Sequence, residues 1–491
     1  MTKILLLISV FWPVAAGIVL YLAHLRERRK LLCGLSLGII LPAAAAALYL
    51  VFSGAEAEVE LIRFSDALVL VLRPDGLGRI FGLVAAVLWP LTALYAFAYM
   101  KEENYLSMFF SFFTQAFGIT LGIAFAGNLF TMYCFYELLT LVTVPLVLQP
   151  MNREASRASQ TYLLFSLGGA AFAFVAMMFL LSHGGTGLFT LGGLTLTLEE
   201  DDIPLFCYFL GFLGFGVKSA VFPLHVWLPK ASVAPTPVTA LLHAVAVVKA
   251  GVFAVIRLTW YCFGPELLAG SWARTAALCL VIVTVVFGSW MAVRETNWKR
   301  RLAYSTVSNL SYILFGALLL TESGLAAGLV HLLNHSCIKI LAFFCAGAVL
   351  CRTGIRRVDE LDGLGRRMPL TAACFTAASA ALCGIPPFGG FVSKWQLLSA
   401  ASELGTPLAY AGAFALILSA ILTAIYMFQA AARLLFPSKS GEAAAAERFA
   451  SVREASPLMT VPMLLLALGT LLLGLFGQNV LDAVLASLTA V

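Results

Sequence analysis

The residues best suited to chemistry are ionisable side chains set in strongly apolar sequence. Residues 204–258 form a run that is apolar enough to lie inside a bilayer, yet they include Lys218 and Lys249. A lysine near the middle of a membrane costs about 2.5–3.5 kcal/mol on insertion scales. Side chains kept at that cost indicate a pairing or functional role.

Four basic residues lie inside apolar spans, and all four are lysines: Lys218, Lys249, Lys339 and Lys394. Arginine stays charged in any surroundings, whereas a buried lysine can lose its proton near neutral pH. The choice of lysine therefore predicts groups that titrate.

Glu137, in the run FTMYCFYELLTLVTVPLV, is the only acidic residue well inside a span. It is the natural partner for Lys218. A static ion pair that ties two helices together is one interpretation, but replacing a buried pair by apolar residues is often neutral or stabilising. We therefore favour a switch, in which loosening the pair changes the proton affinity of Lys218.

Five further groups suggest a relay of proton-accepting sites linked by water. His331, His335 and Lys339 follow one another at i, i+4 and i+8, which places them on one helical face. Together with Lys249 and Lys394 they predict a path along which a proton can pass.

Other histidines are weaker candidates. His243 is six residues from Lys249 on the same predicted helix, so the two point to different faces. His225 lies just past a predicted helix break and could open a cytoplasmic entry path. His24 and His183 stand at span ends, where an interfacial position is expected.

The elements that must position these groups are membrane-spanning helices. Of the 491 residues, 61% are hydrophobic and 11% are charged, which predicts an all-α polytopic membrane protein rather than a soluble domain. Dividing the chain at its polar breaks gives about fourteen spans: 4–22, 31–52, 77–100, 105–127, 129–148, 158–182, two within 204–258, 273–292, 302–320, one after Glu322, 368–401, 407–436 and 457–488.

Basic residues fall into every other connection, which holds 21 of the 31 lysines and arginines. The intervening connections are acidic where they are long, as at 56–60 and 199–202. By the positive-inside rule, we expect a multi-pass protein of the cytoplasmic membrane with both termini on the non-cytoplasmic side. Glycine pairs and the TLTL alternation in 183–202 predict a small hairpin there.

Two spans are interrupted by proline and glycine, around 221–223 and 384–390. Such breaks survive in a membrane only where protein packs around them or water reaches them. The breaks are five spans apart, which predicts two inverted five-helix repeats, a sequence sign of a transport site. We therefore expect N-terminal helices in 1–104, repeats in 105–259 and 260–436, and a cytoplasmic linker with a last helix in 437–491.

The ten cysteines form no CxxC pair and no cluster with metal-ligand spacing. There is no dinucleotide fingerprint or phosphate loop either. We therefore expect no metal site and no bound cofactor.

Five motifs give the chain a family resemblance over about residues 60–440: FYELLTL, VKSAVFPLHVWLPKASVAPTPVTALL, VKAGVFAVIRL, NHSCIKILAFFCAGAV and GIPPFGGFVSKWQLL. It resembles the antiporter-like subunits shared by Mrp-type cation/proton antiporters, respiratory complex I and membrane-bound hydrogenases. The resemblance implies that Glu137, Lys218, Lys249 and Lys394 form a proton-translocation axis, linked by the histidines of the eleventh span. Lys394 is similar to the residue of Mrp D-type subunits, whereas Asn128 stands where many relatives carry an aspartate.

The resulting hypothesis is an integral subunit that moves protons, with Na⁺ exchange as a further possibility, beside other membrane subunits and without redox chemistry of its own. The alternative is a pumping subunit of a complex I-like quinone reductase or a membrane-bound hydrogenase. A stand-alone solute carrier is disfavoured because the sequence shows no aromatic or arginine-lined substrate pocket. Nothing suggests nucleic acid as a partner.

Overall fold

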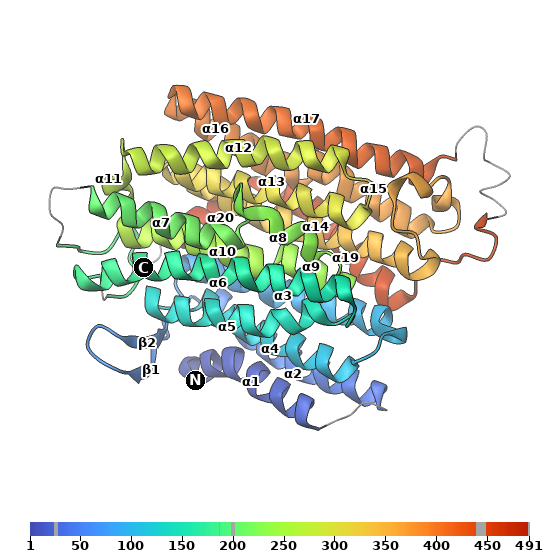
Figure 1. Cartoon of the computed structure of the whole chain (residues 1–491), viewed down its shortest axis with the longest axis horizontal. Helices are drawn as coiled ribbons and strands as arrows, with labels where there is room; N and C mark the ends of the chain where they lie inside the picture. The colour runs from blue at the N-terminus through green and yellow to red at the C-terminus, as the bar shows by residue number, and fades with distance from the viewer. Residues whose placement is uncertain (24–27, 186, 198–201, 438–447, 490–491) are drawn as a thin grey trace.

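The computed structural model describes residues 1–23, 28–185, 187–197, 202–437 and 448–489 as a bundle of nearly parallel helices (Figure 1). The N-terminal part consists of α1 (Thr2–Leu22), α2 (Arg29–Phe52), β1 (Val59–Arg63), β2 (Val69–Leu72), α3 (Gly76–Tyr99), α4 (Leu106–Ala124), α5 (Leu129–Leu148) and α6 (Arg153–Ser182).

The middle of the chain holds α7 (Ile203–Lys218), the short 3₁₀ turn η2 (Leu224–Val226), α8 (Trp227–Ala231), α9 (Thr236–Ala244), α10 (Val247–Ile256), the π-helical segment η3 (Arg257–Phe263) and α11 (Pro265–Leu268). The remainder consists of α12 (Trp272–Arg294), α13 (Trp298–Leu318), α14 (Glu322–Thr353), α15 (Pro369–Cys383), α16 (Gly389–Leu404), α17 (Pro407–Leu435), α19 (Pro457–Leu475) and α20 (Gly477–Thr489).

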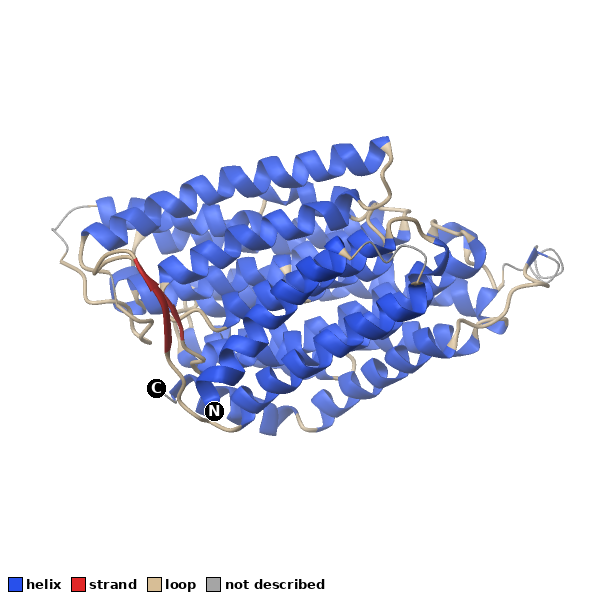
Figure 2. Cartoon of the chain, turned by 90° about the horizontal axis from the view of Figure 1, so that it is seen from below, coloured by secondary structure: helices blue, strands red, loops and turns tan. Residues whose placement is uncertain are grey.

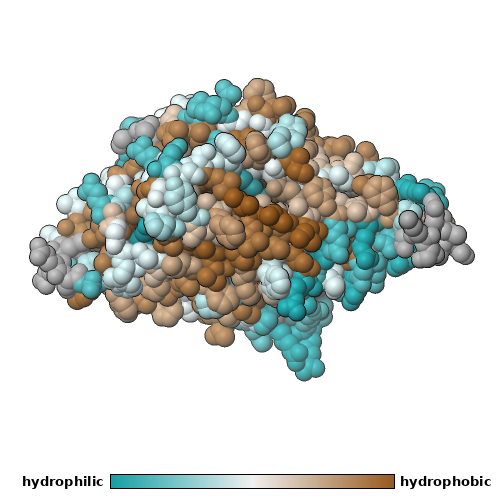
Figure 3. All heavy atoms as spheres, turned by 90° about the horizontal axis from the view of Figure 1, so that it is seen from above, coloured by the Kyte–Doolittle hydropathy of each residue, from teal (hydrophilic) through white to brown (hydrophobic). Residues whose placement is uncertain are grey.

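The helices are apolar enough to cross a membrane. Eleven helices of the described residues meet that test by length and composition, and α7 and α15 are shorter apolar helices. Hydrophobic residues fill the middle of the face in Figure 3, and hydrophilic ones gather toward the end that carries the connection after α17. The chain is thus an all-α polytopic membrane protein, while the number fourteen stays a prediction.

Both predicted interruptions are present. α7 ends at Lys218 and the chain resumes in η2 and α8, while α15 ends at Cys383 and α16 begins at Gly389. Each interruption falls at the fourth helix of its expected five-helix unit. The inverted relation between 105–259 and 260–436 stays a prediction, as do the other two domain bounds.

Two further helices are interrupted where the sequence predicts continuous spans. The eighth span divides into α9 and α10 around Val245 and Ala246, whose φ/ψ angles of −131°/−53° and −81°/−92° are not helical. The last span divides at Phe476, so that α20 packs separately against α14 and α3. The first break contains neither proline nor glycine, so the sequence pattern carried no signal for it. At the second, Gly477 directly follows Phe476, but a single glycine without proline was not distinctive.

The predicted hairpin in 183–202 is wrong for the described residues, which contain no strand there. The backbone N–H groups of Gly192 and Leu194 donate instead to Trp260 and Cys262 of η3, at 3.0 Å each. Hydrogen bonds to η3 thus replace those of a hairpin. The acidic residues 199–201 lie outside the described residues.

Among the described residues, β1 and β2 form an antiparallel hairpin in which Val59 pairs with Leu72 and Arg63 pairs with Val69. It lies at one end of the bundle, and Figures 1 and 2 both place the two chain termini toward that end. The described parts of the basic connections that follow α3, α12, α14 and α17 lie at the opposite end.

The segment from α9 to η3 is the innermost part of the bundle. All residues in its most apolar stretch are buried, whereas only 33% of the residues are buried in the corresponding stretches of α1 and α19 at the periphery. α9 and α10 pack against α14, α13 and α7. Polar side chains on these helices are therefore held away from lipid, where they need partners within the protein.

Candidate functional site

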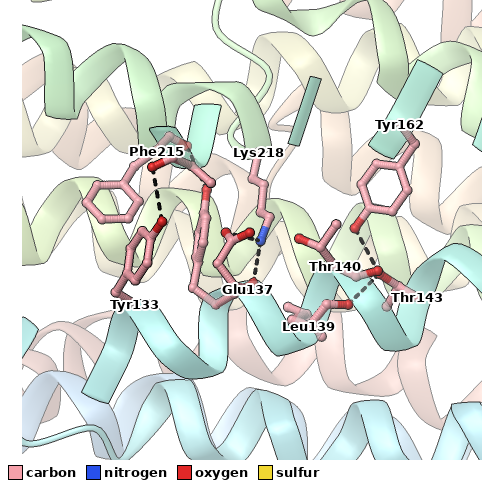
Figure 4. A network of polar contacts seen from close by, with 10 residues as sticks. Tyr133, Glu137, Leu139, Thr140, Thr143, Tyr162, Phe215 and Lys218 are labelled. Atoms are coloured by element: carbon pink, nitrogen blue, oxygen red, sulfur yellow. Dashed lines mark hydrogen bonds and ion pairs between the residues drawn. The ribbon is translucent and has the colours of Figure 1, made fainter. Parts of the chain in front are cut away.

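Glu137 and Lys218 lie on α5 and α7 and point toward each other (Figure 4). The Nζ atom of Lys218 is 3.9 Å from Oε1 of Glu137, which is an ion-pair distance but too long for a hydrogen bond. Lys218 is fully buried, whereas the Glu137 side chain is 23% exposed. The carboxylate thus sits between the buried amine and the side surface of the bundle.

The Lys218 amine is held mainly by Tyr136. Its Nζ donates to the backbone carbonyl of Tyr136 at 2.5 Å and lies 3.3 Å from the centre of the tyrosine ring. Carbonyl oxygens and aromatic faces both attract a cation. Lys218 thus has partners that do not depend on direct contact with Glu137.

Gly251 allows α10 to approach the end of α7. A Cβ atom at this position would lie 2.4 Å from the backbone N of Ser219 and 2.6 Å from the backbone C of Lys218. Backbone atoms cannot move aside as a flexible side chain can. The missing side chain therefore brings the helix that carries Lys249 against the helix that ends in Lys218.

Lys249 and His335 connect α10 to α14. Lys249 Nζ lies 3.1 Å from His335 Nδ1, and both side chains are fully buried. A protonated lysine has no acceptor, so the imidazole Nδ1 must accept while Lys249 is charged. The pair is thus a direct nitrogen-to-nitrogen contact along which a proton can shift.

His331 continues this line along α14. Its ring centre is 6.0 Å from that of His335, and its Nδ1 lies 2.9 Å from Oγ of Ser393 on α16. Ser393 precedes Lys394 directly. The sequence did not single out Ser393, because an isolated serine in a helix carries no recognisable signal.

Lys394 is anchored at the second interruption. Its Nζ donates to the carbonyls of Leu382 and Cys383, at 2.7 and 3.2 Å, where α15 ends. The last carbonyls of a helix have no partner within it and carry partial negative charge. The break between α15 and α16 thus creates the binding site for the Lys394 ammonium.

Lys339 is also fully buried on α14, and its Nζ donates to the carbonyl of Leu302 on α13 at 3.1 Å. The three groups predicted on one face of this helix therefore reach three different neighbours. His331 contacts α16, His335 contacts α10 and Lys339 contacts α13.

Among the described residues, the remaining histidines form no hydrogen bond with these groups. His243 is buried on α9 against the ring of Phe343, and both its ring nitrogens lack hydrogen-bond partners among the described residues. His225 packs against Phe287 with ring centres 4.9 Å apart. His183 ends α6, as expected, and His24 lies outside the described residues.

A buried ion pair was missed by the sequence reasoning, which placed Arg257 near a span end. Arg257 is fully buried at the start of η3, and its Nη1 and Nη2 each lie 2.5 Å from a carboxylate oxygen of Asp75. The expectation that every cation inside a span is a lysine is therefore wrong. Arginine is tolerated here because a bidentate carboxylate partner neutralises it.

Asp75 also caps α3, because its Oδ1 accepts a hydrogen bond from the backbone N–H of Gly78. The signal available in the sequence was an aspartate directly before an apolar helix that begins with glycine. Its distant partner could not be read from the sequence.

Taken together, the described residues form a line of buried titratable groups that runs across the bundle. Glu137 pairs with Lys218, Lys249 contacts His335, and His331 contacts Ser393 beside Lys394. The approach of α10 to the end of α7 at Gly251 brings the first pair near Lys249, although no hydrogen bond or ion pair joins Lys218 to Lys249 among the described residues. No group of three or more potential metal ligands occurs among the described residues. The chemistry that this donor set supports is the acceptance and release of protons.

The fold and these groups define a class: polytopic helical membrane proteins in which proline and glycine interrupt two helices and a buried lysine lies beside each of these two interruptions. Residues 126–423 match the family model described as NADH:quinone oxidoreductase/Mrp antiporter, transmembrane. The chain belongs to this family.

Two relatives illustrate its breadth. The chain is 33% identical over 429 residues to NADH-quinone oxidoreductase subunit N of Desulforudis audaxviator, covering 82% of this chain and 80% of that protein. It is 34% identical over 350 residues to an Na⁺/H⁺ antiporter subunit from Alkalihalophilus pseudofirmus, covering 66% of this chain and 42% of that protein. It thus spans less than half of that longer relative.

Solved structures share the fold over nearly the whole chain. A chain of the Mrp complex from Dietzia sp. DQ12-45-1b has a TM-score of 0.86 at 23% identity, with 99% of this chain and 97% of that chain covered. A chain of respiratory complex I from Thermus thermophilus has a TM-score of 0.81 at 25% identity, with 100% and 99% covered. The similarity to Mrp D-type subunits in particular stays a prediction.

Proposed function

We propose that the protein is a proton-translocating subunit of a multisubunit complex in the cytoplasmic membrane, with both termini on the non-cytoplasmic side. The observation that carries this proposal is the contact between Lys249 and His335, because it connects the two halves of the line of titratable groups. Relatives named as Na⁺/H⁺ antiporter subunits support exchange of protons for Na⁺.

In the proposed mechanism, Glu137 sets the proton affinity of Lys218. While the carboxylate stays near, it favours the charged amine; when the pair loosens, the desolvated lysine releases its proton. The distance of 3.9 Å supports such a role, because the pair can separate without the loss of a direct hydrogen bond. The proton then passes through Lys249 and the α14 histidines to Lys394 and out.

The test is transport by the complete complex in proteoliposomes that contain a pH-sensitive dye. Glu137→Gln keeps the side-chain shape but removes the charge, and we expect proton transport to be lost while the subunit stays assembled. Glu60→Gln is the matched control, because Glu60 is an exposed carboxylate of β1 that pairs with Arg63. Normal transport in Glu137→Gln would overturn the switch.

A second candidate is a pumping subunit of a quinone reductase or hydrogenase, with the redox groups on partner chains. The relative named as subunit N of NADH-quinone oxidoreductase favours it, because this chain covers 80% of the length of that relative. The subunit composition of the purified native complex separates the two. Small Mrp-type subunits support the antiporter, whereas nickel-iron or iron–sulfur subunits support the oxidoreductase.

A further inference from the structure

A pocket of about 720 Å³ opens at the basic end of the bundle. The ends of α3 and α14, the starts of α13 and α19 and the connection between α8 and α9 surround it. Six cationic side chains line it: Arg29, Lys101, Lys299, Arg300, Arg352 and Arg356. Only two carboxylates, Glu103 and Glu154, are among its lining residues.

Part of this positive charge remains available for a ligand. Arg300 pairs with Glu154 at 3.3 Å, and Arg352 donates to the backbone carbonyl of Glu454 at 2.9 Å. A guanidinium has five N–H donors, so each of these contacts leaves most of them unused. Lys299 and Arg29 likewise donate to the backbone carbonyls of Ala234 and Phe97. The excess of positive charge is therefore an excess over the two carboxylates of the pocket.

Six cations against two carboxylates leave the pocket with an excess of positive charge. This excess indicates that the pocket receives an anion.

The start of α13 strengthens this preference. Asn297 caps the helix, and Trp298, Lys299 and Arg300 form its first turn on the pocket wall. The backbone N–H groups of Trp298 and Arg300 already donate to Arg356 and Asn297. The start of this 21-residue helix therefore favours phosphate through its partial positive charge rather than through free donors. Arginine matches the same group through bidentate hydrogen bonds.

The apolar part of the wall indicates where the anion comes from. Leu458, at the start of α19, lines the pocket and is 48% exposed. Val461 and Leu465 continue this exposed apolar face along the same helix. We propose that the pocket binds the phosphate headgroup of an anionic phospholipid, whose acyl chains lie along α19. Basic pockets between helices at the cytoplasmic side suit such headgroups.

The test is native mass spectrometry of the delipidated full-length protein with added phosphatidylglycerol, phosphatidylcholine or inorganic phosphate. We expect retention of phosphatidylglycerol over phosphatidylcholine. Lys299→Gln with Arg356→Gln should weaken phosphatidylglycerol binding by at least about tenfold, since each basic residue near an anionic lipid contributes about 1 kcal/mol. Arg157→Gln with Arg367→Gln is the control, because it removes the same charge outside the pocket.

Three results would overturn the proposal: equal retention of both lipids, equal losses in the pocket and control variants, or displacement of the lipid by inorganic phosphate at equal concentration. A chemical cross-link between the pocket lysines and acidic residues of a partner protein in the native complex would also overturn it. These measurements report lipid binding alone, so they do not depend on proton transport.

Discussion

Lys249 and His335 are 86 residues apart in the sequence, yet Nζ of the lysine lies 3.1 Å from Nδ1 of the histidine. The contact joins α10 to α14 at the centre of the bundle. It is where the line of titratable groups passes from the first predicted repeat to the second.

His335→Gln should lower the rate of proton transport by on the order of 10²-fold, which is typical for loss of a positioned proton-transfer group. Glutamine keeps a hydrogen-bonding side chain near Lys249 but cannot carry the proton. Transport into proteoliposomes measures the effect, with complex assembly checked by gel filtration. Transport at the wild-type rate would show that His335 only positions Lys249.

Lys218→Arg should abolish transport although the formal charge is unchanged. Arginine holds its proton in any protein surroundings, so the variant cannot release it. Lys230→Arg, at an exposed position of α8, is the matched control and should behave as wild type. An active Lys218→Arg variant would mean that Lys218 acts as a fixed charge.

Gly251→Ala should destabilise the protein by about 1–3 kcal/mol, as other overpacked positions do, and should also slow transport. The added methyl group would meet the backbone of α7 beside Lys218. Thermal unfolding in detergent measures the first effect and the proteoliposome assay the second.

The control for this substitution is Gly168→Ala. Gly168 lies within α6, and a Cβ atom there would have no atom within 4 Å. Alanine should leave stability unchanged or raise it by about 0.5–1 kcal/mol, because glycine weakens helix interiors. Equal behaviour of the two alanine variants would refute the close approach of α10 to α7.

Asp75→Asn and Arg257→Met should each destabilise the protein by about 3–5 kcal/mol, because either change leaves the other charge buried and uncompensated. Asparagine is itself a good helix cap, so the loss in Asp75→Asn would report the ion pair rather than the cap of α3. Denaturant titration of the purified protein measures both variants.

The double variant Asp75→Asn with Arg257→Met separates the pair from its surroundings. It removes both charges and should be clearly less destabilised than the sum of the single variants. Additive losses would show that the two side chains do not stabilise each other.

Much of the site could be predicted because its members violate the apolar pattern around them. Lys218 and Glu137 stand out in any hydrophobic span, and proline with glycine marks the interruption before Lys394. The break at Val245 and Ala246 could not be predicted in this way, since both residue types are common within helices. Packing against neighbouring helices overrides such local preferences.

The ion pair between Arg257 and Asp75 could not be predicted from the sequence either. Arg257 looked like a residue near a span end, because its partner Asp75 is 182 residues away. The arginine-lined pocket also escaped prediction, since its wall comes from several separate connections at the basic end.

The sequence by itself determined the membrane environment, the all-helical class, the two proline and glycine interruptions, and the presence of Glu137 and the lysines among apolar residues. These follow from composition and short-range patterns, which need no knowledge of contacts. Only the tertiary structure decided which of these groups touch, because helix packing brings together residues that are far apart in the chain. Lys249 meets His335, and His331 meets Ser393, through the placement of α14 between α10 and α16.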